Sequence, residues 1–190
     1  AAEVARAIAD ESPLAAPAAR TELFALVTAG ADAGDALERA RTCGLPAAEA
    51  ELFRAWAATG RGEPLPAALP TDAAPLLLTM LEALLRIQAF DAFERLLPAI
   101  DRVGLSWRER RERLAAMYFR RGFLESAADE WIAVCQEGVP DGDALVGLAK
   151  VAYARGQADD ALVFAQEAAA LEPDREDAKR LVDALAGAST

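Results

Sequence analysis

The chain of 190 residues contains no histidine and no asparagine, and it has only two cysteines and two lysines. Without histidine it has no Ser/His or Cys/His nucleophile pair and no histidine-ligated metal site. Cys43 and Cys135 have no Cys-x-x-Cys spacing, so each is expected to be a buried, reduced thiol. A glycine-rich phosphate loop is also missing. These absences predict a chain that is not an enzyme on its own and holds no metal and no cofactor.

Long apolar runs and a targeting layout are missing as well. The most apolar run, 73–81, is ended by Glu82, whereas a membrane-spanning helix needs roughly 20 apolar residues. Residues 1–11 carry acids and lack the basic-then-apolar order of a signal peptide. We therefore expect a cytoplasmic protein without a membrane span. The chain begins with Ala rather than Met, as a piece of a longer protein would.

Positive charge is scarce, with 20 basic against 31 acidic residues and a net charge of −11. This balance argues against a nucleic-acid ligand, because phosphate binding needs clustered cations. Hydrophobic residues make up 54% of the chain while aromatic residues make up only 6%, and alanine supplies much of the apolar share. Alanine is the best helix former, so the composition predicts an all-α fold.

One pattern occurs twice at a fixed offset of 34 residues between Arg111 and Pro173. The matching pairs are Leu114 and Leu148, Ala115 and Ala149, Gly122 and Gly156, and Ala127 and Ala161. Small residues allow two antiparallel helices to approach closely, and glycine suits the left-handed position that ends a helix. A single hairpin cannot cover its own apolar faces, so the period predicts stacked helical hairpins.

The two copies resemble the tetratricopeptide repeat. The second copy carries the pattern at Leu145, Leu148, Ala149, Ala152, Gly156, Ala161, Ala165, Ala168 and Pro173, and the first carries it at Leu114, Ala115, Tyr118, Gly122, Ala127, Trp131 and Val134, with Pro140 one place late. The resemblance implies an α-solenoid, a right-handed superhelix of antiparallel helical hairpins. Residues 71–190 are expected to hold these repeats, with 174–186 as a C-terminal capping helix.

A diverged third copy precedes the other two. Its apolar residues fall 34 places before those of the first clear copy, but Gln88 stands where the turn glycine belongs and Pro98 lies inside the second helix. A kink is expected at Pro98.

Residues 1–60 are expected to form irregular N-terminal hairpins, with helices near 18–29, 35–43 and 46–59. Residues 61–70 are rich in proline and glycine and predict an extended connection. This connection is either a domain boundary or an irregular loop within one solenoid.

The resemblance also implies a binding groove lined by the first helix of each hairpin. The groove positions are Glu109, Glu112, Ala116 and Phe119 in one copy and Asp143, Val146, Lys150 and Tyr153 in the next. Phe119 and Tyr153 would form an aromatic ladder for a partner peptide or helix. Alternatively, both are core residues at hairpin contacts. Glu112 and Ala116 replace the Lys and Asn with which family members clamp a C-terminal carboxylate, which argues against chaperone-tail binding.

Charged side chains are densest over residues 107–113, followed by Arg120 and Arg121. Arg108 with Glu112 and Glu109 with Arg113 have the i, i+4 spacing of self-paired helix surfaces. Local pairing leaves Arg110, Arg111, Arg120 and Arg121 as a basic island for an acidic partner.

These patterns predict a non-catalytic protein–protein interaction scaffold. Two alternatives remain. The phrases 88–94 and 121–131 resemble helical tails that follow the catalytic domain of some family 2 glycosyltransferases, which implies a C-terminal tail of a larger enzyme. A self-association module would form a homodimer through apolar ends around Val4 or Leu181.

Overall fold

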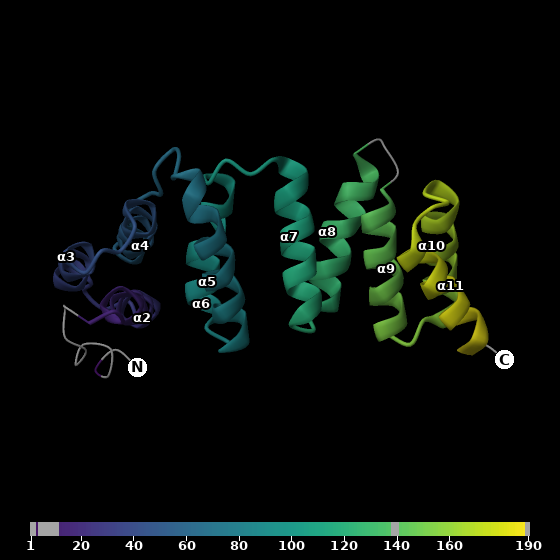
Figure 1. Ribbon diagram of the computed structural model, residues 1–190, viewed down its shortest axis with the longest axis horizontal. Helices are drawn as coiled ribbons and strands as arrows, with labels where there is room; N and C mark the ends of the chain where they lie inside the picture. The colour runs from purple at the N-terminus through teal and green to yellow at the C-terminus, as the bar shows by residue number, and fades with distance from the viewer. Residues whose placement is uncertain (1–2, 4–11, 138–140, 189–190) are drawn as a thin grey trace. The chain divides into compact units, whose positions relative to one another are not determined.

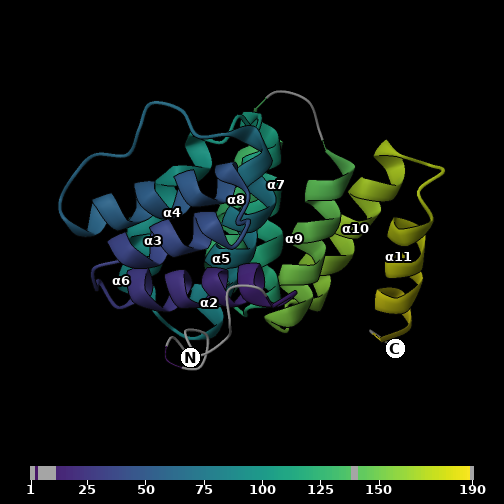
Figure 2. The same cartoon turned by 60° about the vertical axis from the view of Figure 1, so that its left-hand side comes forward.

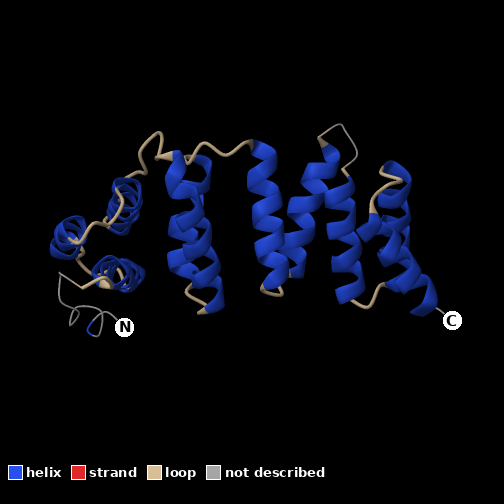
Figure 3. Cartoon of the chain, in the orientation of Figure 1, coloured by secondary structure: helices blue, strands red, loops and turns tan. Residues whose placement is uncertain are grey.

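A computed structural model describes residue 3 and residues 12–137 and 141–188. Regular structure in these ranges is entirely helical, with no strand, which confirms the predicted all-α fold (Figures 1 and 3). The α-helices are α2 (Ala15–Thr28), α3 (Gly34–Thr42), α4 (Ala47–Gly60), α5 (Ala74–Arg86), α6 (Phe90–Leu96), α7 (Trp107–Arg120), α8 (Leu124–Gln136), α9 (Gly142–Ala154), α10 (Ala158–Leu171) and α11 (Glu176–Ala188). Two short 3₁₀ helices are η1 (Thr71–Ala73) and η2 (Leu97–Asp101).

The chain forms two compact units, Ala1–Leu105 and Ser106–Thr190. In the first unit α2, α3 and α4 pack against one another (Figures 1 and 2). Their shared core includes Leu23 and Phe53, neither of which is exposed, and Trp56, which is 1% exposed. The predicted N-terminal helices are therefore present, within a few residues of the expected bounds.

Ion pairs join these three helices. The Glu22 carboxylate on α2 is 1% exposed and contacts the guanidinium of Arg39 on α3. Arg20 on α2 donates two hydrogen bonds, of 2.7 and 2.9 Å, to the Glu49 carboxylate on α4. A buried carboxylate requires such a partner because its desolvation is costly.

The proline-rich connection 61–70 lies inside the first unit. Its Leu69 is 5% exposed, and the Leu69 N–H donates to the Arg102 carbonyl at 2.7 Å. The connection leads through η1 into α5, which packs against α6. At Pro98 the second helix of this hairpin passes into η2, so the expected interruption is a change from α to 3₁₀ geometry.

Helix bounds repeat at intervals of 34 residues. The helices α5, α7, α9 and α11 end at residues 86, 120, 154 and 188, and the helices α6, α8 and α10 begin at residues 90, 124 and 158. Gly122 and Gly156 have φ of +81° and +76°, and Gln88 adopts a φ of +58° at the equivalent place. The turn geometry therefore recurs even where the sequence offers no glycine, although a side chain in this region costs about 1 kcal/mol.

In the second unit α7 packs on α8, α8 on α9, α9 on α10 and α10 on α11. Ala127 and Ala161 are both fully buried, as their shared role at tight helix crossings predicts. Gly147 in the middle of α9 lies directly beneath the indole of Trp131 from α8. A Cβ on Gly147 would lie 2.7 Å from Cζ2 of Trp131 and closer still to two other indole carbons. This glycine therefore sets how closely α8 and α9 approach.

Candidate functional site

The candidate site is the surface of α7 and α9, the first helices of the two clear repeats. The helix α7 begins with a capping box, in which Ser106 Oγ accepts from the Glu109 N–H at 3.2 Å and the Glu109 carboxylate accepts from the Ser106 N–H at 2.9 Å. Hydrogen bonds from the side chain and backbone of Ser106 lower the pKa of Glu109. Glu109, a predicted groove residue, thus has a capping role at the helix start.

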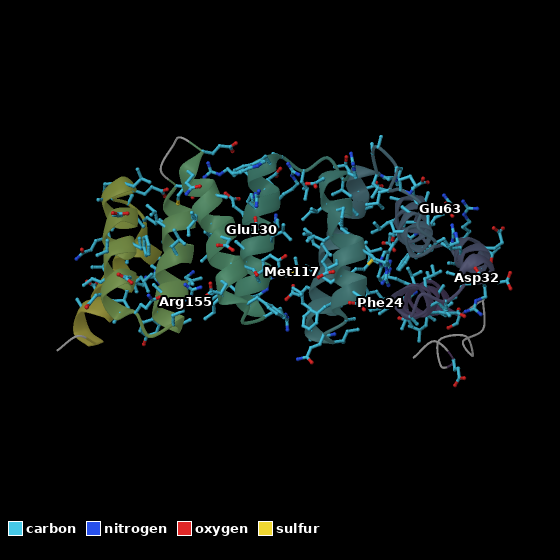
Figure 4. All side chains as sticks on the ribbon, turned by 180° about the vertical axis from the view of Figure 1, so that it is seen from behind. Phe24, Asp32, Glu63, Met117, Glu130 and Arg155 are labelled. Atoms are coloured by element: carbon cyan, nitrogen blue, oxygen red, sulfur yellow. The ribbon has the colours of Figure 1, made fainter. Side chains whose placement is uncertain are left out.

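Charged side chains of α7 are largely paired. Arg108 lies 2.8 Å from Glu112, which confirms the expected i, i+4 pair, and it also contacts Asp141. Arg111 reaches Glu130 on α8 at 2.7 Å (Glu130 is labelled in Figure 4) and lies 5.3 Å from the ring centroid of Trp107. Local spacing left Arg111 unpaired, whereas in the structure its partner comes from the second helix of the hairpin.

The other members of the predicted basic island also have partners. Arg120 and Arg121 are exposed at the end of α7, and Arg110 is half-buried, and each of the three already interacts with another group.

Phe119 and Tyr153 occupy equivalent positions but have different surroundings. Phe119 is half-buried, with its ring centroid 5.9 Å from that of Trp131. Tyr153 is 57% exposed. The residue equivalent to Trp131 in the next repeat is Ala165, which offers no ring for Tyr153 to pack against. Phe119 therefore fits the alternative of a hairpin contact, whereas Tyr153 is available at the surface.

Of the four groove residues predicted on α9, Lys150 and Tyr153 are the two that remain available to a partner. Both are exposed and lie one helical turn apart. Val146 is 3% exposed and packs against Ala168 and Ala178, while Asp143 contacts Arg175. The exposed surface of α9 thus combines an ammonium group with an amphipathic aromatic ring.

Two residues that the sequence patterns did not indicate stabilise the first turns of helices in the second unit. Asp141 is 4% exposed and accepts a 2.8 Å hydrogen bond from the Ala144 N–H, which caps α9. Arg175 contacts Asp143, lies 2.7 Å from Asp177 and 3.3 Å from Glu172. This pairing raises the pKa of Arg175 and lowers the pKa of Asp177. An Asp just before a helix is a recognisable cap, but Arg175 reaches a partner 32 residues away.

Of the two apolar ends predicted to form a homodimer contact, the structure describes the one at Leu181. Leu181 is half-buried against a core that includes Ala149, Ala161 and Leu185, while Val4 lies outside the described residues. Most exposed residues of α11 are charged or small, as in a capping helix.

The remaining candidates for redox or metal chemistry are a cysteine and the acidic side chains. Cys135 is half-buried, and burial raises the pKa of its thiol above the usual range, which disfavours the reactive thiolate. In the described ranges no three His, Cys, Asp or Glu side chains cluster as metal ligands would. None of the described helices has the length and apolar character needed to cross a bilayer.

Comparisons with known proteins add no relative. A scan against protein-family models, a search of curated proteins and a search of solved structures each found no match.

Proposed function

We propose that this chain is a non-catalytic scaffold of tetratricopeptide-like repeats, arranged as a right-handed superhelix, which binds a partner peptide or helix on its first helices. The observation that carries the proposal is the 34-residue interval in the helix bounds, with equivalent turns at Gly122 and Gly156. Repeats of helical hairpins provide extended surfaces for binding other proteins.

The exposed part of α9 defines what such a partner would offer. Tyr153 is a rigid aromatic anchor with a polar hydroxyl, a residue type enriched where binding energy concentrates. Lys150, one turn away, favours a carboxylate on the partner. The partner segment therefore places an acidic residue beside an apolar one. Phe119 contributes through the packing of α7 on α8, and Glu112 remains engaged with Arg108.

Site-specific photo-crosslinking tests this proposal. A benzophenone amino acid is placed at residue 153 and, in a matched control, at Val163 on α10, which is 52% exposed. In cells that express the protein, position 153 is expected to give an adduct of defined mass that position 163 does not give.

Once the partner is identified, Tyr153→Ala should weaken its binding at least about tenfold, because the anchor is lost, while the helical circular dichroism stays unchanged.

The proposal fails if position 153 gives no adduct, or if positions 153 and 163 give the same adducts in equal amounts. Lys150→Glu adds a second criterion, because reversing this charge should weaken an acidic partner further.

A further inference from the structure

A cleft in the first unit lies outside the proposed scaffold surface. It has a volume of about 470 Å³ and is bounded by the ends of α2 and α4, the turn after α5 and the start of α6. A second cleft of about 390 Å³ shares Gly30 and Gly60 with it. Both volumes lie in the range of small-molecule sites. None of the residues predicted to bind a partner lines either cleft.

Two opposite charges line the larger cleft. Asp91 and Arg95 on α6 have the i, i+4 spacing, and acid-before-base is the favourable order on a helix. Arg108 and Glu112 do pair at this spacing, at 2.8 Å. Within the described part of the chain, however, neither Asp91 nor Arg95 forms an ion pair or a side-chain hydrogen bond. The cleft thus contains one carboxylate and one guanidinium that have no ion-pair partner among the described residues.

The remaining lining is mixed, with the polar side chains of Thr28 and Gln88 beside Phe90 and small residues. Phe90 is 44% exposed and lies in the cleft beside Ala89 and Ala92. Gln88, whose φ is +58°, lines the same cleft and is the single non-glycine residue with positive φ in the described ranges.

We propose that this cleft binds a free α-amino acid with an apolar side chain. The ligand carboxylate pairs with Arg95, its ammonium group pairs with Asp91, and its side chain packs on Phe90. Residues four apart on a helix place their Cβ atoms about 6 Å apart, which suits the two neighbouring charges of a zwitterion. A phosphate ligand would be repelled by Asp91, and a lone carboxylate is a poor metal site.

Isothermal titration with L-phenylalanine tests the proposal, with N-acetyl-L-phenylalanine and phenethylamine as probes that each lack one charge. L-Phenylalanine should bind, and each single-charge analogue should bind at least about tenfold more weakly. Asp91→Asn and Arg95→Gln should each weaken L-phenylalanine binding by a similar factor. Their matched controls are Glu94→Gln and Arg102→Gln, at exposed residues that do not line the cleft.

Circular dichroism of each variant ensures that a loss of binding is not a loss of folding. The proposal is overturned if L-phenylalanine, L-leucine and L-alanine all fail to bind. It is also overturned if either analogue binds as well as L-phenylalanine, or if the Glu94 and Arg102 controls lose as much affinity as the cleft variants.

Discussion

Gly147→Ala is expected to destabilise the second unit by about 3 kcal/mol, the upper part of the range for overpacked cores. The added methyl group would overlap the indole of Trp131, and both groups sit on helices that cannot easily move apart. Urea unfolding followed by circular dichroism measures the effect, because a loss of stability lowers the midpoint concentration.

Gly187→Ala is the matched control, because a Cβ at this position on α11 meets no heavy atom within 4 Å. It should leave stability unchanged or raise it by up to about 1 kcal/mol, since alanine is the better helix former. Trp131→Leu combined with Gly147→Ala should cost less than the two single changes added together. Equal stability of the Gly147 and Gly187 variants would show that α8 and α9 are not in close contact.

Arg39→Met is expected to destabilise the first unit by about 3 kcal/mol. It removes the guanidinium that contacts the Glu22 carboxylate, which is 1% exposed and therefore poorly hydrated. Removing one partner of a buried pair costs more than the pair itself contributes, because the remaining buried charge loses much of its compensation. Urea unfolding of the wild type and the variant measures the difference in free energy.

Glu22→Leu in the same chain should restore most of this loss, since an apolar pair of similar size needs no charge compensation. The matched control is Arg41→Met on the same helix. Arg41 lies 3.6 Å from Glu38 in an exposed pair, which is expected to contribute about 0–1 kcal/mol. If Arg39→Met is no more destabilising than Arg41→Met, the Glu22 pair does not stabilise the unit.

The 34-residue period of the sequence predicted the helical hairpins, because each hairpin is formed by residues that lie close together in the chain. The glycines at 122 and 156 and the alanines at 127 and 161 occupy equivalent turns and contacts. At Gln88 the sequence lacks the turn glycine and suggested a departure from the repeat. The backbone turn there is nevertheless the same as at Gly122 and Gly156. The helices on either side determine the backbone there more strongly than the preference of one residue.

The details of the candidate site depend on contacts that local spacing cannot reveal. Arg111 reaches a partner 19 residues away, and Gly147 faces a ring on the preceding helix. The difference between Phe119 and Tyr153 was nevertheless readable, because Trp131 is replaced by Ala165 one repeat later. A comparison of the whole hairpin, rather than of the groove positions alone, would have predicted an exposed Tyr153.

Backbone chemical shifts from nuclear magnetic resonance test whether a 34-residue helical hairpin recurs along the chain. Helical shifts are expected to end at residues 86, 120 and 154, with positive φ at Gln88, Gly122 and Gly156. Helical shifts that continue through any of these three turns, or strand shifts between residues 74 and 137, would contradict this recurrence.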